Sequence, residues 1–251
     1  MKTLIPNRLL FRFEFPLPYR AKPPKINGKL TGWSDAELLP ALGEMDGEET
    51  FAPVWSCWNG DGIYIAAHVT GKRSAPRCDP KEFWKGDNLR LMLDMRDTRT
   101  IKRATKFCHH FYFLPTGGPT KSKPAAKPSE PGARATGRKT ARTTTRSQSS
   151  ALSTQHSPVA GSAPINRAKE NAPVIEPGRI RVASTVLSDG YKLEAHIPAD
   201  CLNGFDPEQH RRIGFYYILE DRDLGRQSFT IGDDLPWHVD PSLWAAAALS
   251  R

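Results

Sequence analysis

Two tryptophans in turn-rich, polar stretches are the residues best suited to chemistry in this chain. Trp84 lies in the segment 80–87 and Trp237 in the segment 232–238. A large aromatic side chain in a loop has little core to fill, and binding residues gather in loops. Because the flat face of an indole ring can stack on the apolar face of a pyranose, both residues are candidates for contact with a sugar.

Three other tryptophans have a simpler explanation. Trp33, Trp55 and Trp58 lie in or beside segments that alternate like strands. Large aromatic side chains in such segments usually fill the core. We therefore expect these three residues to pack inside the protein.

No residues form a recognisable catalytic set. Glu194 and Glu220 occupy separate strand-like segments, and the spacing alone gives no tuned carboxylate pair of the kind that hydrolyses glycosides. The chain has no nucleophile-elbow serine, no glycine loop for phosphate and no dinucleotide fingerprint. We expect no catalytic residues, and a protein that is not an enzyme.

Metal ligands are also weakly represented. The acidic segments 221–223 and 233–234 are typical of turn caps, although their oxygen atoms could bind a structural Ca²⁺. In the Cys-His-His segment 108–110, consecutive side chains of a strand point to opposite faces, so one ion cannot easily use both His109 and His110. Apart from a structural Ca²⁺, we expect no metal and no cofactor.

The four cysteines show no CxxC pair and no metal-finger spacing. They fit buried or free thiols, and a bridge between Cys57 and Cys108 stays open. The first residues lack the uninterrupted apolar stretch of an export signal, and no apolar run is long enough to span a membrane. We therefore expect a cytoplasmic protein without a membrane partner.

The basic character of the chain belongs to one segment. The formal net charge is +9, but residues 116–172 hold ten Lys and Arg against two Glu, which gives +8 there and +1 elsewhere. This segment is rich in Ser, Thr, Pro, Gly and Ala and has no Trp, Tyr or Phe, so it is expected to be disordered. It could act as a solvated tether, or as an arm that binds polyanions such as nucleic acid without stacking on bases.

The rest of the chain forms two blocks, 1–115 and 173–251, neither of which suggests a complete domain. Long loop insertions cost little entropy, so one β-domain interrupted by the disordered insertion 116–172 is the simpler interpretation. Period-two alternation marks its strands, and a turn at 59–62 makes 54–69 a hairpin. The other alternating segments are 9–15, 89–95, 107–113, 180–186, 191–197, 213–219 and 227–231. This pattern predicts an all-β, antiparallel β-sandwich of the immunoglobulin or jelly-roll kind.

Six segments in order resemble the family-nine carbohydrate-binding modules of the DOMON-like superfamily. The segment KINGKLTGW is similar to the opening I-D-G-x-L-x-x-x-W of those modules, and WKGDNLRLMLD is similar to their W-x-x-D-x-V-E-x-x-x-D. The resemblance covers nearly everything outside the insertion. The six segments are 25–33, 58–69, 84–94, 190–198, 213–215 together with 220–223, and 237–242.

The resemblance implies a site. In that family two tryptophans clamp a terminal sugar and polar side chains bond its hydroxyls, which assigns the clamp to Trp84 and Trp237 and places Asp234 where a sugar-bonding Asn usually stands. Arg90 stands where the family has Glu, so an acceptor has become a donor. Hydroxyl bonding must then be rearranged, or the ligand carries negative charge. The family's Arg on the following strand has no clear counterpart in 109–113, and relatives are usually exported.

Three hypotheses follow for the function. The first is a non-catalytic module that stacks a saccharide between Trp84 and Trp237, with a link to carbohydrate catabolism. The second is an intracellular interaction protein with a structural sandwich, whose arm 116–172 binds polyanions. The third follows DOMON relatives that hold haem between Met and His. Here Met92 or Met95 with His68 or His110 would serve. The sequence leaves the oligomeric state open.

Overall fold

The computed structural model describes residues 8, 11–117 and 157–251. Among these residues the regular structure is almost entirely strand, with short 3-10 helices. The strands are β1 (Glu14–Pro18), β2 (Val54–Asn59), β3 (Gly62–Thr70), β4 (Asn88–Asp94), β5 (Cys108–Leu114), β6 (Val159–Ser162), β7 (Arg181–Leu187), β8 (Gly190–Pro198), β9 (Arg212–Asp221), β10 (Gly225–Ser228) and β11 (Ala245–Ser250). The 3-10 helices are η2 (Asp35–Glu37), η3 (Leu42–Asp46), η4 (Ala199–Cys201) and η5 (Pro241–Leu243).

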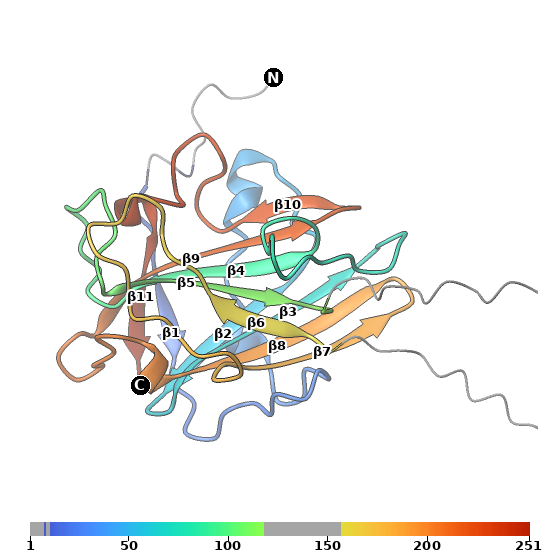
Figure 1. Ribbon diagram of the computed structural model, residues 1–251, viewed down its shortest axis with the longest axis horizontal. Helices are drawn as coiled ribbons and strands as arrows, with labels where there is room; N and C mark the ends of the chain where they lie inside the picture. The colour runs from blue at the N-terminus through green and yellow to red at the C-terminus, as the bar shows by residue number, and fades with distance from the viewer. Residues whose placement is uncertain (1–7, 9–10, 118–156) are drawn as a thin grey trace, which may run out of the picture.

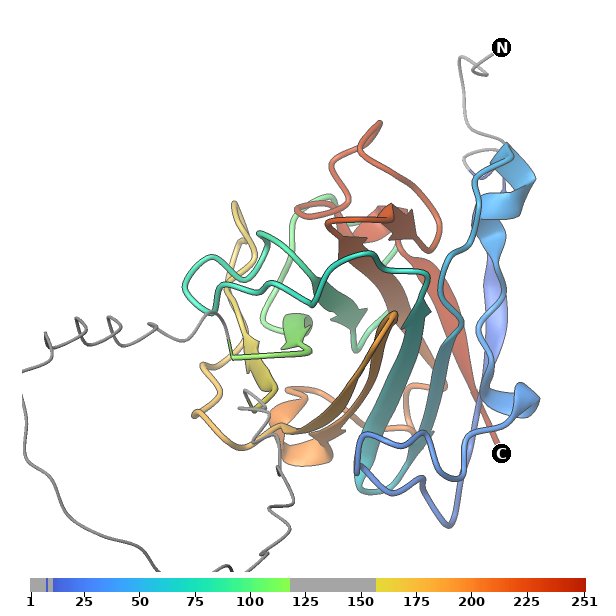
Figure 2. The same ribbon diagram turned by 90° about the vertical axis from the view of Figure 1, so that its right-hand side faces the viewer.

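The strands form two sheets, which confirms the predicted all-β sandwich. The larger sheet has the order β1-β11-β9-β4-β5-β6, with β10 paired to β9, and the smaller sheet has the order β2-β3-β8-β7 (Figure 1). Figure 2 shows teal β3 and orange β8 side by side in the curved smaller layer. All pairs are antiparallel except β1 with β11, which run parallel.

The hairpin of β2 and β3 forms where the turn chemistry predicts it. Asn59 pairs with Gly62 across a two-residue loop, and Gly62 has a φ of 137°. A Cβ at Gly62 would lie 2.0 Å from the carbonyl oxygen of Ile197 in β8. Glycine is therefore required both by the backbone conformation and by the close approach of the neighbouring strand.

Apolar residues from both sheets meet in one core. In β4 the leucines at 89, 91 and 93 alternate with polar or flexible residues, as expected for a strand with one face on the core. The structure also buries the other face of β4, so that every residue of the strand is buried. Loops packed on the outer face of the larger sheet cause this burial, and they build the site described below.

The two sequence blocks interleave in both sheets, because β4 pairs with β9 and β3 pairs with β8. The predicted boundary of the insertion is wrong at its end. Within 116–172, β6 pairs with β5, and Ile165 is buried in the core. Main-chain hydrogen bonds to β5 and one buried apolar side chain order this stretch, although its composition is poor in large apolar residues. Most of the predicted insertion, 118–156, lies outside the described residues.

The N-terminal strand is shifted from its predicted position. The alternation over 9–15 predicted an apolar face that includes Phe11, but β1 begins at Glu14 and Phe11 is 59% exposed. Phe15 and Leu17 supply the buried face instead. Apolar residues at every second position continue beyond the predicted segment 9–15, to Leu17. Pairing with β11 determines which of these residues form the buried face of the strand.

The structure also tests the expected core tryptophans. Trp58 is fully buried, and its Nε1 donates to the carbonyl oxygen of Leu17 at 2.9 Å. Trp33 and Trp55 are only partly buried. Trp33 donates its Nε1–H to the buried carboxylate of Glu194 at 3.0 Å, which ties the 25–33 segment to β8.

All four cysteines are buried and free, so the bridge between Cys57 and Cys108 is not formed. The two residues belong to β2 and β5, which lie in different sheets. In the described part of the chain, no helix is long and apolar enough to cross a membrane.

Candidate functional site

A cavity of about 630 Å³ lies on the outer face of the larger sheet. This volume is within the range of small-molecule sites. Residues from three central strands, from β10 and from three loops meet there. The lining residues are Phe83, Trp84, Arg90, His110, Ala163, Pro164, Asn166, Glu220, Arg226, Trp237 and His238.

Strand register places the polar lining residues on one face. Arg90 of β4 lies opposite Ile218 of β9, and the next same-face pair joins Asn88 to Glu220. Side chains two residues apart share a face, so Arg90 and Glu220 project from the sheet together. His110 of β5 reaches the same face, because it lies opposite Met92, two residues from Arg90.

Trp84 forms the exposed wall of the cavity. Its side chain is 47% exposed, and its ring meets Phe83 edge to face at a centroid distance of 5.1 Å. Phe83 in turn stacks on Tyr112 of β5 at 4.3 Å and meets His110 edge to face at 5.4 Å. These stacked and edge-to-face rings support Trp84 from beneath the loop. Much of the Trp84 indole stays open to a ligand.

Trp237 lines the cavity from a more buried position, with 4% of its surface exposed. Its ring stacks on Tyr216 of β9 at 5.1 Å, and the guanidinium carbon of Arg90 lies 5.2 Å from its centroid. Its Nε1 donates to Asp233 at 3.4 Å, and its carbonyl oxygen accepts from Trp244. These contacts fix the ring, and they cover much of its surface.

Arg90 is the centre of an ion-pair group in the cavity wall. Its Nη2 lies 3.0 Å from Oε2 of Glu220, and its Nε donates to Asn88 at 3.1 Å. Glu220 also accepts from Arg226, which pairs with Asp233 as well. The carboxylate of Glu220 in β9 therefore holds the predicted site residue Arg90, and it is shared with Arg226 of β10.

The two histidines of β5 point to opposite faces, as predicted from strand geometry. His110 lines the cavity, and burial, together with the nearby charges of Arg90 and His238, lowers its pKa to about 3. His109 lies on the other face, where burial lowers its pKa to about 4 despite a contact with the carbonyl oxygen of Asn203. Both rings are neutral at pH 7.

The structure brings three of the four predicted site residues together, since Trp84, Arg90 and Trp237 all line the cavity. Asp234 is exposed and does not line it. Its neighbour Asp233 makes the contacts to Arg226 and Trp237 instead. The roles of all four residues in binding a sugar stay predictions.

Sequence reasoning missed several lining residues. Phe83 could have been found from its position next to Trp84. Arg226 and the segment 163–166 gave no such signal, because one follows a turn and the other lies in the segment expected to be disordered. Only the pairing of β10 with β9 and of β6 with β5 brings them to the cavity.

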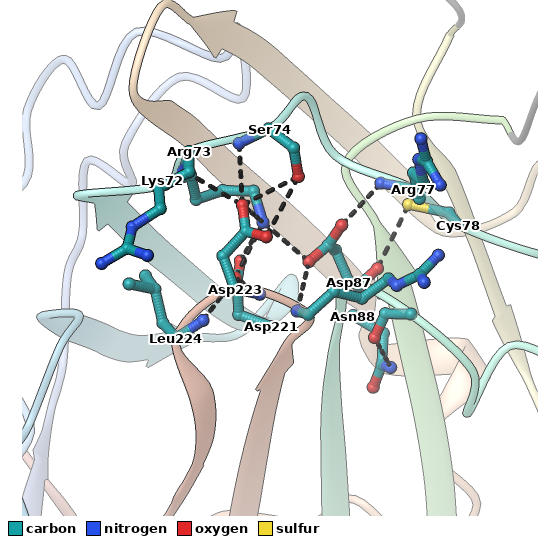
Figure 3. A network of polar contacts seen from close by, with 12 residues as sticks. Lys72, Arg73, Ser74, Arg77, Cys78, Asp87, Asn88, Asp221, Asp223 and Leu224 are labelled. Atoms are coloured by element: carbon teal, nitrogen blue, oxygen red, sulfur yellow. Dashed lines mark hydrogen bonds and ion pairs between the residues drawn. The ribbon is translucent and has the colours of Figure 1, made fainter.

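A buried lysine fixes the loop that carries Trp84 (Figure 3). Nζ of Lys72 lies 2.9 Å from Oδ1 of Asp87 and 2.7 Å from both carboxylate oxygens of Asp221. Burial opposes the charged form of Lys72, but the hydrogen bonds that it donates to both carboxylates raise its pKa overall. Asp87 also accepts from the main-chain N–H of Arg222 at 2.9 Å. Both ends of the loop 71–87 are thereby attached to the turn after β9.

This arrangement does not fit the structural Ca²⁺ that the sequence allowed at 221–223. The oxygens of Asp221 already surround the Lys72 ammonium, and Asp223 accepts from the main-chain N–H groups of Arg73 and Ser74. A calcium ion needs six to eight oxygen ligands, and a lysine ammonium at their centre excludes it. Among the described residues, no three His, Cys, Asp or Glu side chains form a group suited to a metal ion.

The chain is similar in fold to solved structures of carbohydrate-binding modules. A family-nine carbohydrate-binding module from Caldicellulosiruptor kristjanssonii in complex with cellotriose is similar at a TM-score of 0.56 and 14% identity, over 95% of this chain and 94% of that one. A family-nine module from the same organism in complex with glucose gives a TM-score of 0.57 and 13% identity, over 95% of this chain and 96% of that one. A candidate carbohydrate-binding protein from Bacteroides uniformis gives 0.51 and 10%, over 96% and 100%.

Other comparisons add no relative. No protein-family model matches the chain, and no curated protein sequence matches it. The resemblance to family-nine modules predicted from six short segments is confirmed at the level of the fold. The protein has the β-sandwich architecture of these modules, with almost the full length of the chain aligned.

Proposed function

We propose that this protein is a non-catalytic saccharide-binding module whose ligand occupies the cavity beside Trp84. The exposed indole of Trp84 is the single observation that carries the proposal. This large aromatic residue is 47% exposed and faces a cavity of about 630 Å³. Its exposure to water is unfavourable, and a sugar ring stacked on the indole would remove that apolar surface from water. The family-nine module that shares the fold is solved with cellotriose and with glucose, which supports the same class of ligand.

The two predicted clamp residues have unequal roles in this proposal. Trp84 supplies the free stacking face, whereas Trp237 is held by Tyr216 and Arg90 and forms the floor of the cavity. The sugar hydroxyls would be bonded by polar lining groups rather than by Asp234. Asn166 and Glu220 provide acceptors for this purpose, and Arg90 provides donors.

The carboxylate content of the cavity lining favours binding over hydrolysis. Among the described lining residues, Glu220 is the one carboxylate, and it is paired with Arg90 and Arg226. Glycoside hydrolysis by the usual route requires two carboxyl groups on either side of the scissile bond. A single carboxylate held between two guanidiniums can accept a hydrogen bond, but it is poorly placed to act as a general acid.

The experiment is a thermal-shift screen against mono- and disaccharides, including uronic acids, followed by calorimetric titration of the best ligand. Trp84→Ala should lower affinity at least about thirtyfold, the size of a binding hot spot. Trp237→Phe keeps an aromatic ring on Tyr216 and should also weaken binding with the fold intact. Phe11→Ala is the matched control, because Phe11 is an exposed aromatic residue outside the cavity. Unchanged affinity in both tryptophan variants would refute the proposal.

A polyanion-binding arm at 116–172 is a second proposal. Most of it, 118–156, lies outside the described residues, and the described part, 157–172, packs on β5 through β6. Deletion of 118–156 should remove any nucleic-acid affinity that falls steeply with salt. A link to carbohydrate catabolism, a cytoplasmic location and the haem hypothesis also stay predictions, and a colourless purified protein would exclude haem.

A further inference from the structure

The cavity lining carries more positive than negative permanent charge. Arg90 and Arg226 line it together with one carboxylate, Glu220. Glu220 serves both cations, because Oε2 lies 3.0 Å from Nη2 of Arg90 while Oε1 accepts from Arg226. One carboxylate cannot neutralise two guanidiniums, so the wall keeps an excess positive charge.

The second partner of Arg226 does little to cancel this excess. Asp233 pairs with Arg226, but its side chain is 71% exposed and it lines the neighbouring pocket instead. Water and salt screen an exposed ion pair strongly, so its field inside the cavity is weak. The charge of Arg90 is less screened, because only 9% of its side chain is exposed.

Arg90 is also positioned to meet a ring in the cavity. Its guanidinium carbon lies 5.2 Å from the centroid of Trp237, which lines the same cavity. Hydrogen bonds to Asn88 and Glu220 hold it there through Nε and Nη2. A substituent of a sugar ring beside Trp237 therefore falls within reach of a fixed, partly desolvated cation. Burial lowers the pKa of Arg90 overall and Arg226 adds to the shift, although Glu220 and Asp233 oppose it, so the cation is incompletely compensated.

We propose that the ligand is a saccharide bearing a carboxylate, a hexuronic acid residue, and that Arg90 and Arg226 bind that carboxylate. This inference rests on the saccharide-binding function proposed above and narrows its ligand class. The planar fork of a guanidinium matches the geometry of a carboxylate, and such charge-assisted bonds are about twice as strong as neutral ones. A neutral sugar would displace water from the two cations without compensating their charge.

The test compares each acid with its neutral counterpart by isothermal titration calorimetry of the full chain. The probes are glucuronic acid with glucose, and galacturonic acid with galactose, and glucose 6-sulfate tests whether any anionic group suffices. The expected result is a preference of about tenfold or more for the uronic acids over the neutral sugars, and over the sulfate ester. This preference should shrink as salt concentration rises.

Two variants and one control test the residues. In Arg90→Gln and in Arg226→Gln the ratio of uronic-acid to neutral-sugar affinity should fall towards one. Arg226 is partly exposed, so its variant remains informative if Arg90→Gln does not fold. Arg212→Gln is the matched control, because Arg212 begins the same strand β9 but does not line the cavity, and it should keep the preference.

The outcomes separate the two proposals. Neutral sugars that bind as tightly as uronic acids would overturn the charged-ligand inference and leave the saccharide site intact. Equal binding of glucose 6-sulfate and glucuronic acid would overturn the choice of carboxylate. Binding of no sugar, acidic or neutral, by the folded protein would overturn the saccharide-binding proposal itself.

Discussion

Replacing Lys72 with methionine should destabilise the protein far more than the loss of a surface charge would. The side chain of Lys72 is 1% exposed, and the side chains of Asp87 and Asp221 are 1% and 0% exposed. Methionine fills a similar volume but leaves both carboxylates buried without their cation. The main-chain N–H of Arg222 still donates to Asp87, but nothing replaces the positive charge.

The magnitude follows from the cost of an uncompensated buried charge. Removal of one partner from a buried ion pair typically costs about 3–5 kcal/mol. In a protein of this size each kcal/mol shifts the melting temperature by about 2–4 °C, so the midpoint should fall by roughly 10 °C. Since the loop 71–87 carries Trp84, the variant should also bind sugar more weakly well below its melting temperature.

Urea unfolding at pH 7 measures the change, with Lys85→Met as the matched control. Lys85 lies in the same loop, but its side chain is 61% exposed and its partner Glu82 is three residues away. Surface pairs of this kind contribute about 0–1 kcal/mol.

Repeating the measurement at lower pH adds a second test. Burial raises the pKa of Asp221 and Lys72 lowers it, so without Lys72 the folded-state pKa of this carboxyl rises further, and protonation favours the folded variant more than the folded wild type. The deficit of Lys72→Met should therefore shrink as the pH falls from 7 towards 4.

A loss in Lys72→Met no larger than that in Lys85→Met would refute this reasoning. It would show that the desolvation penalty of Lys72 cancels its attraction to the two carboxylates. A deficit that grows as the pH falls would contradict the assignment of the loss to uncompensated carboxylates. The combined variant with Asp87→Asn and Asp221→Asn should recover part of the lost stability, because it removes the stranded charges.

The remaining predictions concern acid stability, thiols and one glycine. The pKa values of His109 and His110 are depressed to about 4 and about 3, so the unfolded chain binds more protons than the folded protein below pH 6.5, and the free energy of unfolding should fall as the pH drops from 6.5 towards 4. Urea unfolding at several pH values should show this fall, and His109→Gln should make the free energy of unfolding depend less on pH. All four cysteines are buried, and burial raises the pKa of Cys57 and of Cys108 to about 12. A thiol reagent should therefore label almost no cysteine before denaturation and four cysteines afterwards. Rapid labelling of the native protein would contradict the burial. Gly86 has a φ of 88°, and a Cβ there would lie 2.1 Å from the carbonyl oxygen of Arg77. Gly178 has a similar φ of 83° but open space around it, so Gly86→Ala should cost more stability than Gly178→Ala. Equal losses in thermal unfolding would show that the loop around Gly86 moves away freely.

Part of the candidate site could be predicted from sequence because its signals are local. A tryptophan in a polar, turn-rich stretch has little core available, which is enough to nominate Trp84. The alternation around Arg90 and His110 assigns each residue to a strand face without knowledge of the partner strands. The same local reasoning overestimated the exposure of Trp237, because it could not show that Tyr216 lies beneath that loop.

The sequence by itself determined the all-β class, the hairpin at 54–69 and the residues of β4 that face the core, since each depends on a repeat of two residues and on turn chemistry. Only the tertiary structure decided that the outer face of β4 is covered, that 157–172 is ordered as part of the wall, and that Lys72 lies between Asp87 and Asp221. These features join residues far apart in the chain. Local patterns carry no information on such contacts, because the free energy that forms them comes from burial and charge pairing between distant segments.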